Sequence, residues 1–203
     1  MNATLALKRP RTKPAEIRRE ELMDAAQRLF LEKGFDETSV DEIVRAAHVA
    51  KGTFYWYFKS KDDVLLALQT RFIDRFCSEI EEAVGRLPEN DWSGRLDTWL
   101  ETAVNGYLDQ VAVHDLIFHD IRPSNRRMKQ DNPVITPLAT FLEAGARHGA
   151  WVAEDARLAA VMVFSALHGA VDDSVVASVP IDRNALIKAV RSFCRRALAC
   201  PAP

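Results

Sequence analysis

Apolar residues recur along this chain at spacings of three and four, which places them on one face of an α-helix. In residues 15–33 the apolar positions are Leu22, Ala25, Ala26, Leu29 and Phe30, and Gly34 follows as a left-handed stop. The same spacing predicts helices over residues 40–47, 60–87, 92–113, 133–149, 155–179 and 182–199, with a short one at 114–122. The alternation typical of strands does not appear, so we predict an all-α fold.

Capping signals mark two of the expected helix starts. Ser39 with Glu42 fits a capping box, and Ser60 with Asp63 fits the start of a long helix. Either Pro133 or the Thr136-Pro137 pair can open the helix that ends near Gly149. Residues 122–132 are polar, basic and without a period, so we expect a mobile loop there.

Two short helices and a tight turn, from Ser39 to Phe58, form a candidate helix-turn-helix, in which the second helix enters the major groove of DNA. Spacing alone is weak evidence, because many helical bundles contain short helices joined by short turns. The second helix adds hydroxyl groups, an indole and a cation where a core helix would carry apolar residues: Lys51, Thr53, Tyr55, Trp56 and Tyr57. Phe54 and Phe58, four residues apart, are expected to anchor it to the first helix.

The segment from Thr38 to Leu65 closely resembles the DNA-binding signature of TetR-family (tetracycline-repressor-like) transcriptional regulators. Its centre reads Lys51-Gly52-Thr53-Phe54-Tyr55-Trp56-Tyr57-Phe58-Lys59-Ser60-Lys61, and the likeness extends over residues 18–68, about a quarter of the chain. The resemblance implies an all-helical homodimer, with an N-terminal operator-binding domain and a C-terminal domain that binds a small inducer and dimerises. Most such proteins are repressors.

The resemblance also implies individual DNA contacts. Contacts to the DNA backbone are expected from Thr38 or Ser39, Lys51, Thr53, Tyr57 and Lys61, and base contacts from Lys51-Gly52 and the exposed faces of Tyr55 and Trp56. The chemistry agrees, because a cation at a phosphate adds affinity without sequence choice, whereas a ring on a thymine methyl adds choice. The alternative for each aromatic residue is packing inside the small domain.

The turn departs from the family pattern at two positions. Where the family commonly has Ala-Gly-Val-Ser, this chain has Ala47-His48-Val49-Ala50. A left-handed His48 would cost about 1 kcal/mol relative to glycine, and Ala50 would forgo about 1 kcal/mol from a capping hydroxyl. His48 could instead contact a phosphate.

The formal charge of −2 is unevenly distributed along the 203 residues. Residues 1–19 contain six basic side chains and one acidic one, which suggests either a polyanion partner or a solvated tail at that end. We predict a basic flexible arm over 1–14, a helix-turn-helix domain over 15–62, and an effector-binding and dimerisation domain over 63–203.

The larger C-terminal part contains candidate effector-pocket residues among its apolar groups. They are Trp99, Tyr107, Phe118, His119, Phe141, Met162, His168 and Asp172. The apolar ones among them are more often plain core than pocket. His168 and Asp172 share a helix face, as do Asp115 and His119. The two members of each pair could therefore hydrogen-bond to each other or to a ligand. Spacing shows no third ligand for a metal, and we predict neither a metal nor a cofactor.

The last two helices are expected to form the homodimer, as the corresponding helices do in TetR-like proteins. The first has a mostly small-residue stripe and the second an apolar face: Ala159, Val163, Ala166, Ala170 and Val171, then Leu186, Ile187, Val190, Phe193, Ala197 and Leu198. Both faces could instead be buried within their own subunit.

Other functional classes receive little support from the sequence. No catalytic motif rises above background, so an enzyme is not expected. The apolar stretch from Leu158 to Val171 is shorter than a membrane span, the N-terminus lacks the order of a signal peptide, and the three cysteines show no disulfide or metal spacing. We therefore expect a cytoplasmic regulator that binds a DNA operator and a small effector and makes no membrane contact. A helical lipid or ligand carrier is the alternative, but it leaves the Lys51–Lys61 segment unexplained.

Overall fold

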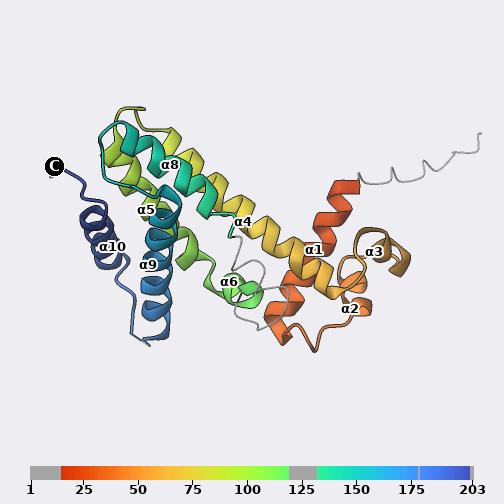
Figure 1. The fold of residues 1–203 in the computed structure, drawn as a ribbon. Coiled ribbons are helices and arrows are strands. Elements are labelled where there is room, and N and C mark those ends of the chain that lie inside the picture. Colours follow the sequence, from red (N-terminus) through yellow and green to blue (C-terminus); the bar gives the residue numbers. More distant parts are fainter. Residues whose placement is uncertain (1–14, 119–131, 178, 202–203) are drawn as a thin grey trace, which may run out of the picture. The chain divides into compact units, whose positions relative to one another are not determined.

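The computed structural model describes residues 15–118, 132–177 and 179–201, and within these ranges the regular secondary structure is all helical (Figure 1). This confirms the predicted all-α fold. The helices are α1 (Ala15–Lys33), α2 (Val40–Ala46), α3 (Lys51–Tyr57), α4 (Lys61–Gly85), α5 (Trp92–Asp109), α6 (Val111–Phe118), α8 (Ile135–Arg147), α9 (Ala156–Val176) and α10 (Arg183–Ala197).

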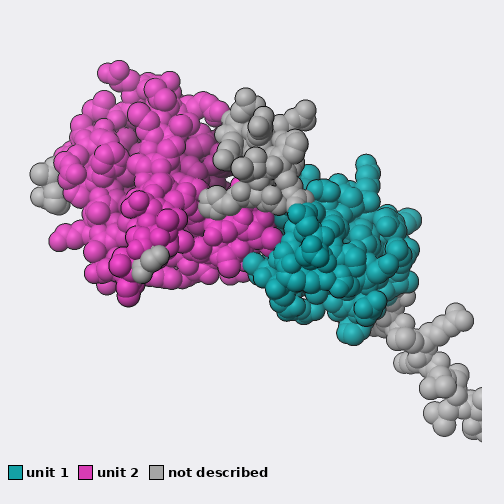
Figure 2. Space-filling view, turned by 90° about the horizontal axis from the view of Figure 1, so that it is seen from below, with its two compact units in different colours: residues 1–68 teal, residues 69–203 magenta. Residues whose placement is uncertain are grey.

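The chain divides into two compact units, residues 1–68 and 69–203 (Figure 2). The division falls six residues after the predicted domain boundary at 62/63. Helix α4 contains this division, so its first two turns belong to the first unit and the remainder belongs to the second.

The first unit contains α1, α2 and α3 around a small core. Helix α1 ends at Gly34, whose φ is +89° and whose N–H donates to the carbonyl of Phe30 at 2.9 Å, as the predicted left-handed stop requires. The core side chains are buried because the apolar stripes of α1 and α2 face each other: Leu22, Met23, Ala26, Phe30, Ile43 and Phe54.

The second unit is a helical bundle, in which α9 packs against α8, α5 and α10, and α10 also packs against α5. Aspartates cap three of its helices: Asp91 accepts from Gly94 N–H, Asp155 from Leu158 N–H and Asp182 from Ala185 N–H, at 2.9 to 3.0 Å. The three cysteines are free thiols, with Cys194 buried.

One predicted helix boundary is wrong. The apolar stripe suggested a helix over 92–113 followed by one at 114–122, but α5 ends at Asp109 and α6 starts at Val111. Gln110 breaks the helix with φ −127° and ψ 24°, and periodicity missed this break because both flanking helices keep apolar residues in phase. The predicted loop at 122–132 lies almost entirely outside the described residues.

Helix α9 has an unusually apolar outward side. The apolar stretch from Leu158 to Val171, on which the prediction rests, is shorter than a membrane span. Among the described residues, the whole of α9 is long and apolar enough to cross a membrane, by length and composition alone. Only 28% of its most apolar 18-residue window is buried, so the described part of the chain leaves much of the apolar surface of α9 exposed.

Candidate DNA-binding surface and effector cavity

Helix α2 starts at a capping box, as predicted. Ser39 N–H donates to Glu42 Oε2 at 2.9 Å and Glu42 N–H donates to Ser39 Oγ at 3.3 Å. Hydrogen bonds from Lys33 and Ser39 lower the pKa of Glu42 to about 2. Thr38 is buried, and its hydroxyl donates to the carbonyl of Gly34 at 2.8 Å. The hydroxyl groups of Thr38 and Ser39 therefore stabilise the entry to α2 in the free protein.

The turn between α2 and α3 has the two features expected from its sequence. His48 adopts φ +54°, the left-handed conformation that glycine tolerates best. Ala50 occupies the N-cap of α3 with extended backbone angles, φ −74° and ψ 149°, and offers no side-chain cap. Both local costs estimated from the sequence are therefore present in the folded chain.

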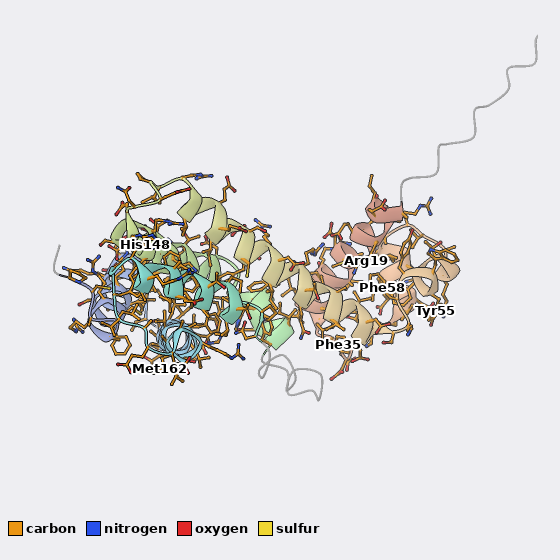
Figure 3. All side chains as sticks on the ribbon, turned by 45° about the horizontal axis from the view of Figure 1, so that its top comes forward. Arg19, Phe35, Tyr55, Phe58, His148 and Met162 are labelled. Carbon is orange, nitrogen blue, oxygen red and sulfur yellow. The ribbon has the colours of Figure 1, made fainter. Side chains whose placement is uncertain are left out.

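Helix α3 separates its aromatic residues into two groups. Phe54 and Phe58 are buried, with ring centroids 5.8 Å apart, as predicted for anchors. Trp56 is 80% exposed and Tyr55 is 53% exposed; Figure 3 shows Tyr55 on the outer side of the unit. Packing inside the domain, the alternative for Tyr55 and Trp56, is therefore not what the structure shows.

The remaining residues of α3 predicted to contact DNA lie beside these rings. Lys51 and Gly52 are exposed, and Thr53 and Tyr57 are half-buried. Lys51 Nζ lies 2.8 Å from Asp41 Oδ1, and this ion pair raises the pKa of Lys51. The amine remains accessible, because 54% of the Lys51 side chain is exposed.

Lys61 has a different environment from the one its predicted role suggests. Its Nζ donates to the carbonyl oxygens of Phe35 at 2.7 Å and Asp36 at 3.2 Å, and lies 4.6 Å from the centre of the Phe35 ring. Lys61 thus closes the turn after α1 in the free protein. A phosphate contact by Lys61 stays a prediction.

The second unit contains a cavity of about 560 Å³, within the usual size range of small-molecule sites. Helix α4 contributes three of its apolar side chains, Phe72, Ile73 and Phe76. The other lining residues come from α5, α6, the segment that leads into α8, the first residue of α8, and α9: Tyr107, His114, Phe118, Asn132, Pro133, Val134, Ile135, Arg157, Val161, Phe164, Ser165, Leu167, His168, Gly169 and Asp172.

One wall of this cavity holds a chain of polar groups. Tyr107 Oη donates to Asp172 Oδ1, and burial together with this hydrogen bond raises the pKa of Tyr107, which keeps the phenol protonated. His168 Nδ1 lies 3.1 Å from Asp172 Oδ2, and His168 Nε2 lies 3.1 Å from His114 Nε2. Asp172, His168 and His114 therefore form a continuous polar chain, in which the histidine tautomers set which ring nitrogen donates.

Comparisons with known proteins agree with the geometry of both units. The family model for bacterial regulatory proteins, tetR family, matches residues 22–68, which include α2, the turn and α3. The fatty acid metabolism regulator protein of Bacillus subtilis (strain 168) is 27% identical over 174 residues, which are 81% of this chain and 84% of that protein. This chain belongs to the TetR family of transcriptional regulators.

Further relatives support the assignment of this TetR-family chain. The regulator EthR of Mycolicibacterium smegmatis is 42% identical over 67 residues, 33% of this chain and 31% of that protein. The structure of the fatty acid degradation regulator FadR from Bacillus halodurans matches with a TM-score of 0.74 and 25% identity, covering 95% of this chain and 100% of that one. The chain is thus a DNA-binding transcriptional regulator rather than an enzyme or a carrier.

The structure brings together half of the predicted pocket residues of this regulator. Tyr107, Phe118, His168 and Asp172 line the cavity. His119 lies outside the described residues. The other three do not line the cavity, and the reason differs for each of them.

Trp99 and Phe141 pack into the apolar core instead, Phe141 with its ring 5.4 Å from that of Trp151. Met162 is 58% exposed on α9 and points outward in Figure 3. Helical periodicity cannot distinguish a side chain that packs in the core from one that lines a cavity, because both lie on the same apolar face of the helix.

Several lining residues were missed from the sequence. Phe72 and Phe76 read there as ordinary core of α4, and His114 is paired with a residue 54 positions away. The available sequence signal for His114 was a histidine within a short, otherwise largely apolar helix. Among the described residues, no group of three potential ligands is arranged to hold a metal ion.

Proposed function

We propose that this protein is a cytoplasmic repressor that binds a palindromic operator as a homodimer and is released by a small, largely apolar effector. The observation that carries the effector class is the cavity, whose walls are mainly phenyl rings and aliphatic side chains. Two relatives that align over most of their length are named for fatty acid metabolism or degradation. An effector with an aliphatic chain, in a circuit of fatty acid metabolism, fits both facts.

The DNA-reading surface is α3. Tyr55 and Trp56 contact bases, because their side chains are largely exposed on α3 and do not pack in the core of the first unit. Lys51, Thr53 and Tyr57 contact the DNA backbone around them, Gly52 lies against the bases, and the basic arm over 1–14 adds charge. Thr38, Ser39 and Lys61 support the surface through the bonds already described, and any phosphate contact of theirs is made in addition.

The dimer forms through α9 and α10, but by a different face of α9 from the predicted stripe. Ala159, Val163 and Val171 of the predicted stripe are buried within their own unit. So are Ile187, Val190 and Leu198 of the face predicted on the last helix. The exposed apolar residues lie on the opposite side of α9 and on α10: Leu158, Met162 and Val176, with Phe193. An uncovered apolar surface of this kind is typical of a subunit interface.

Helix α4 connects effector and operator. Phe72, Ile73 and Phe76 line the cavity from α4, and the same helix begins at Lys61 in the DNA-binding unit. An effector that fits the cavity better in one position of α4 than in another shifts the protein toward that position. Unequal affinity of the effector for the two states is all that release requires.

The DNA part is tested by selecting bound duplexes from a random pool with the full-length protein. We expect a palindrome with half-sites one helical turn or more apart. Lys51→Ala should weaken specific and random duplexes alike and reduce the salt slope by about one, whereas Trp56→Ala should weaken the selected operator far more than a random duplex. Equal loss on both duplexes for Trp56→Ala would remove its base-reading role.

The effector part is tested on the selected operator by fluorescence anisotropy. Oleate should release the protein from DNA, and hexanoate, which fills much less of the cavity, should do so only at higher concentration. Tighter DNA binding in oleate would overturn release by the effector and show that the ligand favours the DNA-bound state. A lack of effect from either acid would refute the aliphatic effector while leaving DNA recognition intact.

A further inference from the structure

Asp41 and Lys51 form an ion pair that joins the two helices of the helix-turn-helix. Asp41 lies in the first turn of α2 and Lys51 is the first residue of α3, and Lys51 Nζ lies 2.8 Å from Asp41 Oδ1. Asp41 takes no part in the capping box of α2, which Ser39 and Glu42 form. The ion pair is therefore separate from the interactions that start α2.

Lys51 lies at the end of α3 where a cation is least favourable. The N-terminus of a helix carries a partial positive charge, and the first turn of α3 contains no acidic residue of its own. The N-cap residue, Ala50, also offers no side-chain oxygen to this end of the helix. Asp41 supplies the negative charge from the neighbouring helix, and the pair raises the pKa of Lys51.

The same amine is exposed on the surface that is proposed to bind DNA. The side chains of Lys51 and Asp41 are 54% and 60% exposed. Lys51 and Tyr55 are four residues apart and share a face of α3, on which the Tyr55 side chain is also exposed. A phosphate that approaches the amine of Lys51 therefore approaches the carboxylate of Asp41 as well.

We propose that Asp41 competes with DNA phosphate for Lys51 and so lowers the affinity of this regulator for DNA of any sequence. The proposal rests on the backbone contact of Lys51 in the proposed function, and adds a residue whose carboxylate opposes that contact. To bind Lys51, a phosphate must displace or share the amine that Asp41 holds in the free protein. The carboxylate then lies close to the DNA backbone, whose negative charge repels it.

The strength of this competition follows from the exposure of the pair. Ion pairs between exposed side chains are weak because water and salt screen them, and they typically change an equilibrium constant by a factor of about 1.5 to 5. Removal of the Asp41 charge should therefore tighten DNA binding by about two- to fivefold. Competition of this size can be overcome by DNA and can still be measured.

A purely structural role for the pair predicts the opposite change. The turn between α2 and α3 contains the left-handed His48 and the uncapped Ala50, so an ion pair across it could serve only to hold α3 in place. Loss of the carboxylate would then loosen α3, and DNA binding would weaken. The direction of the change in affinity distinguishes the two roles.

The test is Asp41→Asn, which keeps the shape of the side chain and removes its charge. Binding of the full-length protein to the selected operator and to a random duplex is measured by fluorescence anisotropy over a range of salt concentrations. At low salt both duplexes should bind about two- to fivefold more tightly than to the wild-type protein. The salt slope should become steeper by up to about one, because the gain shrinks as salt screens the charges. Asp41→Ser, which also removes the charge, should give the same gain.

Glu32→Gln is the matched control for the loss of one negative charge. Glu32 is in the same unit, its side chain is also 60% exposed, and its ion-pair partner is Arg28 of α1 rather than a residue of α3. The effect of Glu32→Gln measures the general consequence of removing one acidic charge from this unit. We expect it to be smaller than the effect of Asp41→Asn.

A double-mutant cycle with Lys51→Ala determines whether Asp41 acts through the amine. In the Lys51→Ala background, Asp41→Asn should change the affinity by no more than Glu32→Gln does. An undiminished gain in that background would mean that Asp41 acts on the DNA without competing for Lys51, and it would overturn the proposal. Amide hydrogen exchange over residues 51–58 shows whether α3 remains folded in each variant.

The outcomes separate this proposal from the proposed function. If Lys51→Ala leaves the binding of both duplexes unchanged, the backbone contact of Lys51 fails and the competition fails with it. If Lys51→Ala weakens binding but Asp41→Asn does not tighten it, the contact stands and the competition alone is overturned. A gain on the operator alone would assign the pair to base reading and would also overturn the competition. Tighter binding of both duplexes that Lys51→Ala abolishes establishes Asp41 as the competitor of phosphate.

Discussion

The uncapped start of α3 offers a sharp test of the local energetics of the DNA-binding unit. Ala50 already has the extended backbone angles of an N-cap, so Ala50→Ser needs no rearrangement before its hydroxyl accepts a backbone N–H of the first turn. We expect α3 to gain about 1 kcal/mol. Because α3 has only seven residues, this gain is large relative to its own stability.

The measurement is amide hydrogen exchange over residues 51–58 of the full-length protein. A gain of about 1 kcal/mol in the opening free energy slows exchange about fivefold at 25 °C. The isosteric pair Ala50→Thr and Ala50→Val isolates the hydroxyl, because the two side chains have similar shape and only threonine can accept the hydrogen bond. Amides of α9 in the second unit provide an internal reference and should not change.

The result that refutes this reasoning is equal exchange for the Thr and Val variants, or no slowing in Ala50→Ser. Either would mean that the N–H groups of the first turn of α3 already have partners in solution. His48→Gly tests the other local cost in the same way. Relief of a left-handed residue with φ +54° should stabilise the turn by about 0.5–1 kcal/mol.

Three further perturbations probe other parts of the structure. Gly145→Ala would place a Cβ 1.9 Å from Cζ2 of Trp151, and should destabilise the full-length protein by about 1–3 kcal/mol or more in urea denaturation. The pKa of Glu42 is lowered from 4.5 to about 2, so its stabilising contribution is complete above pH 4.5 and lost as the pH falls through about 2; Glu42→Gln should remove this part of the acid dependence of α2 exchange. Tyr107→Phe deprives Asp172 of a buried donor and should cost about 1–3 kcal/mol by the same denaturation assay, and no change would mean that water replaces the phenol.

Local features of this chain were readable from its sequence. The capping box at Ser39 and Glu42 depends on groups three residues apart, and the stop at Gly34 depends on one residue's backbone freedom. The division of α3 into buried phenylalanines and exposed Tyr55 and Trp56 follows from helical spacing. These features could be predicted because the interacting groups are neighbours in the sequence.

Contacts between distant segments were not readable in the same way. The family resemblance implies a phosphate contact for Lys61, whereas in the structure its amine binds carbonyl groups 25 and 26 residues earlier. His114 completes the cavity's polar wall through a histidine 54 residues later. Sequence identifies the donor in each case, but only the fold selects the acceptor.

The sequence by itself determined the fold class, the helices apart from the break at Gln110, the family and the helix proposed to read DNA, because periodicity and capping are local and the signature of α3 is contiguous. The tertiary structure decided which apolar residues pack in the core, which line the cavity, and which remain exposed on α9. The physical reason is that an apolar pattern shows which side chains favour removal from water, but it does not show which groups they pack against. In this protein Val163 packs against a neighbouring helix and Phe72 lines a cavity, whereas Met162 remains 58% exposed on α9.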